Sequence, residues 1–311
     1  MVNLDFRLLI HIGYHKTGTT WLQRQIFKKP AYGFDSPWTR ERVTADFIKS
    51  DGLSPLPDQA ISYYRLAAHQ SQSRGFVPVI SHERLSGYPS SGGYDAKIIA
   101  DNLYNAFPDA KIFIVIRNQY SMLRSWYMQY ILDGGVLSLY NFLHPPQPQL
   151  ERIPHFRASF YEYDRLIKYY NSRFSSNNVL VLPFEMLVNN SETFVSRLFL
   201  FNELTPPLIH HIKIINPSKS QSEILITRIA NRMFFYNQLN PNPLISFPAL
   251  INHLNILHWL ARLLSPDALN RYLDRIINNE IGIFINSLYR KSNSETEQLL
   301  GIDLSKYGYD V

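Results

Sequence analysis

The sequence predicts an α/β fold in which helices flank a central parallel β-sheet and a helical extension follows at the C-terminus. Four short apolar runs show no polar alternation, which is typical of strands buried on both faces of a parallel sheet. Helical patterns lie between these runs, and strand patterns stop after residue 205. The 311 residues are enough for one large domain. We therefore expect a single domain over 1–311, with an α/β core at 1–205 and a mainly helical part at 206–311.

The expected strands alternate with expected helices along the first two thirds of the chain. The strands are RLLIHI (7–12), FVPVI (76–80), KIFIVI (111–116) and NVLVLP (178–183). Apolar spacing predicts a helix that opens at TTWLQRQIF, directly after the loop that follows the first strand. Further helices are expected at 95–107, 121–132, 191–201 and 220–235.

Polar residues follow directly after each expected strand. The four following segments are GYHKTGTT, SHERLSG, RNQYSMLRS and FEML. In an open α/β sheet, ligands bind beyond the carboxyl ends of the strands. We therefore expect these four segments to converge on one cleft.

The composition narrows the class of ligand and the compartment. Basic residues exceed acidic ones by 31 to 25, which favours an anionic ligand. The excess is mild and evenly spread, so no nucleic-acid partner is expected. The absence of cysteine excludes disulfides and cysteine metal sites. The N-terminal sequence lacks a signal-peptide pattern, and polar residues interrupt the apolar stretch 248–264. We therefore expect a cytoplasmic protein with no integral membrane segment, and an amphipathic helix at 248–264.

The stretch HIGYHKTGTTWLQ (11–23) carries the first strong functional signal. Gly13 and Gly18 have the G-x-x-x-x-G spacing of a phosphate-binding loop. A strand, a glycine-rich turn and a helix start place backbone N–H groups around an anion, and the helix dipole assists. Thr19 stands where a Walker A loop has its lysine, and a lysine comes earlier, at Lys16.

The neighbouring strand argues against a metal-dependent nucleotide triphosphatase or kinase. Such enzymes need an acidic residue at a strand end to help hold Mg²⁺. The strand 111–116 is instead followed by Arg117. The histidines show no metal-ligand spacing, so no metal site is expected. The sequence favours a loop that uses Lys16 directly on its anion.

Four segments resemble the sulfotransferases that use 3′-phosphoadenosine 5′-phosphosulfate (PAPS), a family with a P-loop-like fold. KTGTTWL (16–22) is similar to the family's 5′-phosphosulfate loop. IRNQYSMLRSWY (116–127) is similar to the 3′-phosphate motif, an arginine at a strand end followed eight residues later by a serine. VLVLPFEML (179–187) and the tail 291–309 resemble a later strand and the C-terminus of bacterial members. The motifs run through most of the chain in the family's order.

The resemblance implies roles for residues at the matching positions. Lys16 would stabilise charge on the bridging oxygen of PAPS, and Arg117 and Ser125 would bind the 3′-phosphate. No metal would be required. The other residues implied to bind the cofactor are Thr17, Gly18, Thr19, Thr20 and Trp21. The family's C-terminal Arg-Lys-Gly element has no clear counterpart here, and Lys219 is the nearest substitute.

The general base for the acceptor is left open between three residues. Glu83 is the first choice, because a corresponding acid acts as base in some glycan sulfotransferases that this chain resembles. If the chain stays extended after the strand 76–80, Ser81 and Glu83 share one face and His82 points away. His15 and His82 are the second and third choices. Glu83 could alternatively form an ion pair with Arg84 or Arg117.

The leading interpretation is thus a PAPS-dependent sulfotransferase that acts on a hydroxyl or amine. The acceptor would be a small metabolite, a natural product or a glycan, and the sequence does not choose among them. Segments 31–75, 134–160 and 236–265 lie outside the family motifs and are expected to shape its pocket. The alternatives are a P-loop kinase of a small metabolite and a non-catalytic nucleotide-binding protein of the same fold.

Overall fold

A computed structural model describes most of the chain as two compact units. The described residues are 7–50, 53–145, 155–208, 219–237, 239–245 and 267–311. Unit 1 takes those within Met1–Asn118, Arg157–Ile215 and Tyr289–Val311. Unit 2 takes those within Gln119–Phe156 and Asn216–Leu288. The expected division at residue 205 is not the division between these units. Gln119–Phe156, which precedes it, belongs to unit 2, and Tyr289–Val311, which follows it, belongs to unit 1.

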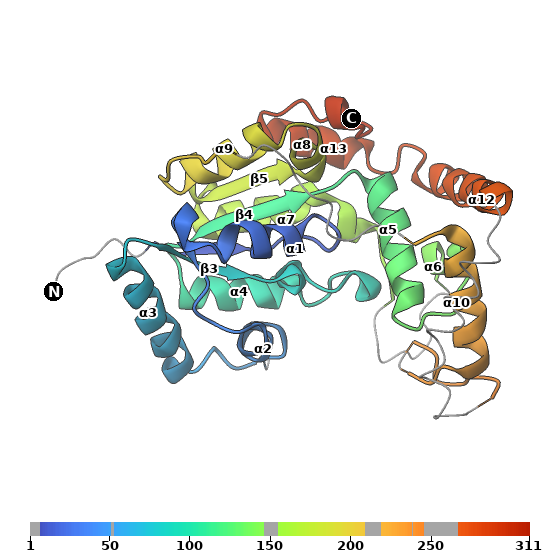
Figure 1. The fold of residues 1–311 in the computed structure, drawn as a ribbon, viewed down its shortest axis with the longest axis horizontal. Coiled ribbons are helices and arrows are strands. Elements are labelled where there is room, and N and C mark those ends of the chain that lie inside the picture. Colours follow the sequence, from blue (N-terminus) through green and yellow to red (C-terminus); the bar gives the residue numbers. More distant parts are fainter. Residues whose placement is uncertain (1–6, 51–52, 146–154, 209–218, 238, 246–266) are drawn as a thin grey trace. The chain divides into compact units, whose positions relative to one another are not determined.

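Unit 1 is built on a parallel five-stranded sheet in the order β2-β3-β1-β4-β5 (Figure 1). Four of its strands confirm the apolar runs of the sequence. These are β1 (Leu9–His11), β3 (Val77–Ser81), β4 (Lys111–Ile116) and β5 (Val179–Pro183). The fifth, β2 (Phe34–Asp35), was not predicted, because two residues at a sheet edge carry no periodic signal.

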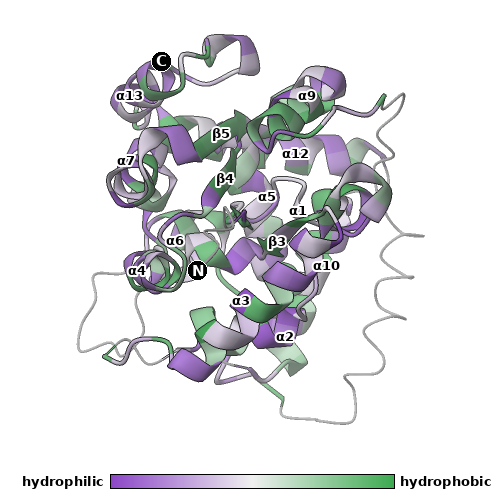
Figure 2. Cartoon of the chain, turned by 90° about the vertical axis from the view of Figure 1, so that its left-hand side faces the viewer, coloured by the Kyte–Doolittle hydropathy of each residue, from purple (hydrophilic) through white to green (hydrophobic). Residues whose placement is uncertain are grey.

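Burial of the strands explains why their sequences are apolar. All three residues of β1 are buried, and so are five of the six in β4. Figure 2 shows β3, β4 and β5 in green, with helices on both sides of them. Helices α4 (Ala96–Ala106) and α7 (Tyr163–Phe174) lie on one face, and α1 (Thr19–Leu22) and α9 (Ser191–Phe201) lie on the other. The predicted fold class, a parallel sheet flanked by helices, is confirmed.

The remaining helices of unit 1 come mainly from segments without a family motif. Helix α13 packs against α7, and α3 packs against β3. Short α1 and α2 each continue without a break into a wider π-type turn, η1 (Gln23–Phe27) and η3 (Thr44–Ile48). The helices not yet bounded are α2 (Arg40–Val43), α3 (Asp58–Ser73), α8 (Phe184–Asn189) and α13 (Arg290–Leu300).

Unit 2 is helical in the part that the structure describes. Helix α5 (Gln119–Leu132) packs against α10 (Gln221–Phe234) and α12 (Asp267–Ile285), and α6 (Leu139–Leu143) contacts α12. Ser220 and Glu223 form a capping box that fixes where α10 begins. With α13, these helices confirm the helical C-terminal part.

Over the described residues, no helix is long and apolar enough to cross a bilayer. The helix expected at 248–264 lies outside the described residues.

Candidate functional site

The glycine-rich loop lies at the point where the order of the strands reverses. It leaves β1, which is paired with β3 on one side and with β4 on the other. Such a switch point is where open α/β sheets bind their ligands. The loop then enters α1 at Thr19. The polar segments after β1, β3 and β4 therefore emerge side by side, as expected.

Two residues of the loop adopt the left-handed conformation that turns the chain sharply. Lys16 has φ 63° and Gly18 has φ 81°. A positive φ is uncommon at a residue with a side chain and indicates a conformation enforced by the surroundings. The Lys16 side chain is exposed at this turn.

The two glycines of the motif are required by close packing. A Cβ at Gly18 would lie 3.1 Å from side-chain carbons of both Phe184 and Leu187. A Cβ at Gly13 would lie 2.6 Å from Nε2 of His11 and 3.2 Å from Oγ1 of Thr19. All three distances are shorter than an ordinary van der Waals contact. Glycine therefore lets the loop lie close to His11 at the end of β1, and at Gly18 it also permits the positive φ beside α8.

The side chains of Thr17 and Tyr14 fasten the loop from inside. Thr17 is fully buried, and its hydroxyl donates to the carbonyl of Tyr14 at 2.5 Å. The Tyr14 ring packs edge-on against Tyr163 at 4.9 Å and Phe160 at 5.2 Å between ring centroids. The Thr17 hydroxyl thus holds the turn, which leaves its backbone N–H as the group that could face a ligand.

A buried hydroxyl at the start of α1 lacks an internal partner. Oγ1 of Thr19 is buried and has no hydrogen bond within the described parts of the chain. The same holds for Nε2 of His11, whose Nδ1 is 2.8 Å from the Ser81 hydroxyl. Burial lowers the pKa of His11 to about 3, so its ring is neutral at pH 7. Burying a hydroxyl without a hydrogen-bond partner is costly unless a ligand or a water molecule supplies that partner. The inside of this loop therefore fits an anion.

Arg117 joins the end of β4 to the glycine-rich loop. Its guanidinium donates to the carbonyl of Lys16 at 2.8 Å and lies over the Phe184 ring, 5.0 Å from the centroid. The Arg117 carbonyl accepts a 2.6 Å hydrogen bond from the hydroxyl of Tyr163. Two cations from distant parts of the sequence are thus tied to one backbone turn. The Phe184 ring thus supports the Arg117 side chain.

Glu185 braces this region. Its Oε1 accepts from the backbone N–H of Asn118 at 3.0 Å, and its Oε2 accepts from the Tyr309 hydroxyl at 3.3 Å. Burial raises the pKa of Glu185 above its ordinary value. The loop after β4 and the C-terminal tail are therefore both anchored on one carboxyl group.

Glu83 forms an ion pair that the sequence did not predict. Both of its oxygens accept from the guanidinium of Arg40, one of them at 3.0 Å. Arg84 is paired with Asp95 instead, at 2.8 Å, so the alternative considered for Glu83, an ion pair with Arg84 or Arg117, does not form. Burial is the largest influence and raises the pKa of Glu83, but the hydrogen bonds and charge of Arg40, the charge of His82 and a backbone hydrogen bond together bring the pKa down to about 2. Sequence reasoning missed Arg40 because it lies in the segment 31–75, which carries no family motif.

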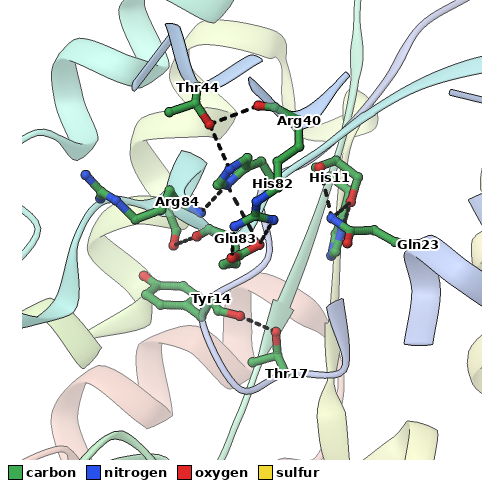
Figure 3. Close-up of polar contacts among 11 residues, drawn as sticks. His11, Tyr14, Thr17, Gln23, Arg40, Thr44, His82, Glu83 and Arg84 are labelled. Carbon is green, nitrogen blue, oxygen red and sulfur yellow. Dashed lines mark hydrogen bonds and ion pairs between the residues drawn. The ribbon is translucent and has the colours of Figure 1, made fainter. Parts of the chain in front are cut away.

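His82 is occupied by the fold itself (Figure 3). The chain does not stay extended after β3, since Glu83–Ser86 form a 3₁₀ turn that His82 caps. Nδ1 of His82 accepts from the backbone N–H of Arg84 at 3.0 Å, and Nε2 lies 3.2 Å from the Thr44 hydroxyl. Burial lowers the pKa of His82 to about 4. The expected alternation of Ser81 and Glu83 on one face is therefore replaced by a tight turn.

His15 lies beside the loop, edge-on to Tyr88 with 6.5 Å between ring centroids. Burial lowers its pKa to about 3, partly offset by the charge of Glu83. Its ring is therefore neutral at pH 7 and lies within electrostatic reach of Glu83.

The other predicted site residues are divided between the units. Thr20 is half-buried and Trp21 is 8% exposed at the start of α1 in unit 1. Ser125 on α5 and Lys219, just before α10, are half-buried in unit 2. The pairing of Ser125 with Arg117 stays a prediction. Among the described residues, no group of three or more histidine, aspartate or glutamate side chains is arranged to hold a metal ion.

Comparison with solved structures identifies the fold. The chain is similar to a sulfotransferase from Alicyclobacillus acidocaldarius, with a TM-score of 0.53 and 18% identity over 96% of this chain and 98% of that chain. It is also similar to the sulfotransferase domain from the curacin biosynthetic pathway, with a TM-score of 0.42 and 13% identity over 64% of this chain and 74% of that one. No protein-family model and no curated protein sequence matches the chain. The likeness to the first structure shows that the chain has a sulfotransferase fold.

Proposed function

We propose that this protein is a sulfotransferase that moves a sulfuryl group from PAPS to a hydroxyl or amine of an acceptor. The observation that carries the proposal is the bond between Arg117 and the carbonyl of Lys16. It joins a glycine-rich anion loop to a strand-end arginine, and these two segments are the ones that resemble the family's phosphosulfate and 3′-phosphate motifs. The sulfotransferase fold supports the same assignment.

The residues of unit 1 suit the groups of the donor. Backbone N–H groups of residues 17–20 and the unpartnered hydroxyl of Thr19 would hold the 5′-phosphate at the helix start. Arg117 would fork onto the 3′-phosphate, because a planar guanidinium binds phosphate oxygens in pairs. PAPS, when bound, supplies an activated sulfuryl group on its 5′-phosphate.

Lys16 is the residue assigned to stabilise the transition state, so it should have the largest effect on the rate of sulfuryl transfer. In the transfer, a bond forms between the acceptor oxygen or nitrogen and sulfur, while the bond from sulfur to the bridging oxygen breaks. Negative charge then grows on that bridging oxygen, and adenosine 3′,5′-bisphosphate leaves. An ammonium held by the left-handed turn at Lys16 would stabilise this charge without reorganising first. Positioning supplies the rest, as it does in phosphoryl transfer.

Glu83 is the base that we assign to the acceptor proton. Its pKa of about 2 means that it is ionised at any physiological pH. Arg40 occupies two of its acceptor positions, and a carboxylate has about four lone-pair sites. His82 uses both ring nitrogens within the fold, which argues against it as the base. His15 remains the second choice.

A radiolabelled transfer assay tests the proposal. The protein is incubated with ³⁵S-labelled PAPS and a panel of phenols, alcohols, amines and glycans, with Lys16→Ala as the matched variant. We expect label to enter at least one acceptor, and Lys16→Ala to lose about 10²-fold or more of the rate. If adenosine 3′,5′-bisphosphate binds but no acceptor is labelled, the chain is a nucleotide-binding protein rather than a transferase.

A further inference from the structure

A cavity of about 560 Å³ lies next to Glu83, within unit 1. It is bounded by the turns around α2, by the 3₁₀ turn after β3 and by the residues that lead into α4. Its lining residues are Arg40, Thr44, Ile48, Lys49, Ser50, His82, Arg84, Tyr94 and Asp95. None of them belongs to a family motif, so nothing in the resemblance explains the cavity.

The sheet order places this cavity away from the residues assigned to the donor. The loop after β1 has β4 and Arg117 on one side and β3 with its following turn on the other. The cavity is on the β3 side. A molecule in it would lie beside the turn that carries Glu83, on the other side of β1 from the strand that ends at Arg117. An acceptor there would be close to the base that we assign and apart from the residues assigned to the donor.

The lining carries more positive than negative charge. Arg40 is neutralised by Glu83, and Arg84 is neutralised by Asp95. Lys49 is exposed and has no hydrogen-bond or ion-pair partner for its ammonium among the described residues. Nη1 of Arg84 is buried and also lacks a partner there. Two basic side chains thus retain donors that no group in the described part of the chain uses.

The Arg40 side chain is also accessible from the cavity. Its side chain is 51% exposed although both of its terminal nitrogens contact Glu83. A guanidinium carries five N–H donors, so an incoming anion can bind Arg40 while part of the contact with Glu83 persists. The cavity therefore offers Lys49 and Arg40 together as a binding site for an anionic group.

We propose that this cavity binds the acceptor and selects acceptors that carry a carboxylate near the hydroxyl to be sulfated, with Lys49 and Arg40 contacting that carboxylate. This inference rests on the proposed function, since it assigns the second substrate of the same site. Sugar acids and aromatic hydroxy acids share the required chemistry. Neutral acceptors of the same shape would leave the Lys49 charge unmatched and bind more weakly.

Equilibrium binding to matched pairs of probes tests the proposal without turnover. Calorimetry compares 4-nitrophenyl β-D-glucuronide with 4-nitrophenyl β-D-glucoside, which differ only at C6, where the first has a carboxylate and the second a hydroxymethyl group. A second pair, 4-hydroxybenzoate and 4-hydroxybenzamide, distinguishes aromatic acids from sugar acids. We expect the acid of at least one pair to bind about tenfold more tightly than its neutral partner at low salt. The preference should shrink as salt is added.

Variants assign the preference to the cavity. Lys49→Gln should reduce the ratio of affinities at least about threefold, and adding Arg40→Met should bring it close to one. Lys97→Gln changes an exposed lysine of α4 outside the cavity and should leave the ratio unchanged. Equal binding within both pairs, or a preference that survives the double variant, overturns the proposal. Binding of adenosine 3′,5′-bisphosphate is measured on the same protein, so that a failure of the donor site is seen separately.

Discussion

The ion pair between Arg40 and Glu83 gives a prediction that can be worked out from the structure. In the variant Arg40→Met, the guanidinium that donates to both oxygens of Glu83 is removed. Burial, which raises the pKa, is then opposed only by the charge of His82 and a backbone hydrogen bond. We expect the pKa of Glu83 to rise from about 2 by at least about one pH unit. The carboxylate would become a stronger base, and a larger fraction of it would be protonated at a given pH.

The pair should also contribute to the free energy of unfolding. A pKa lowered from 4.5 to about 2 corresponds to at most about 3 kcal/mol at pH 7. Arg40 is 51% exposed, so solvent screening reduces this to about 1–2 kcal/mol. Because the pKa is lower in the folded state, this stabilisation is complete above the ordinary pKa of 4.5. It is lost as the pH falls through about 2.

Two measurements check this prediction. A ¹³C NMR titration follows the side-chain carboxyl carbon of Glu83, assigned with Glu83→Gln. Urea unfolding at pH 7 and at about pH 3 measures how the loss of stability in Arg40→Met depends on pH. Arg42→Met is the matched control, since Arg42 lies on the same helix and pairs with Asp46. An unchanged titration of Glu83 in Arg40→Met would refute the reasoning.

Three further substitutions test the way the loop is held. Gly18→Ala should cost about 1–2 kcal/mol more in urea unfolding than Gly75→Ala, because both have a positive φ but only Gly18 is crowded; equal losses would contradict the packing argument. Tyr163→Phe should lower the free energy of unfolding by about 1 kcal/mol and weaken binding of the bisphosphate, because the hydroxyl positions Arg117. An unchanged affinity in calorimetry would contradict this role. Thr17→Val should destabilise by about 1–3 kcal/mol, and a melting temperature equal to that of the wild type would rule out the buried bond.

The sequence predicted the sheet well because its strands are buried on both faces. Continuous apolar runs gave β1, β3, β4 and β5 to within a few residues. Strand β2 was missed, as only Phe34 and Asp35 form it. Helix α3 was missed as well, because the segment 31–75 was interpreted only as part of a pocket. The partition into two units was also not foreseen, because helix α13 returns to unit 1 through contacts distant in sequence.

The motifs of the candidate site could be found in the sequence, but the contacts that hold these motifs in place could not. The glycine spacing pointed to Gly13 and Gly18, and the resemblance to the sulfotransferase motifs pointed to Lys16 and Arg117, whose roles stay predictions. The partner of Glu83 was not predictable, since Arg40 is distant in sequence and an ion pair between a turn and a short helix has no spacing rule. The role of Tyr163 was hidden for the same reason. Its hydroxyl reaches the Arg117 carbonyl only once β4 and α7 are packed together.

Calorimetric titration with adenosine 3′,5′-bisphosphate, with and without Mg²⁺, tests the central claim most directly. The account predicts binding that is independent of Mg²⁺ and that Arg117→Ala weakens about tenfold or more. Lys16→Ala should retain part of the affinity, because the backbone of the loop still holds the 5′-phosphate. Tight binding of ATP with Mg²⁺, together with no binding of the bisphosphate, would contradict the account and favour a kinase.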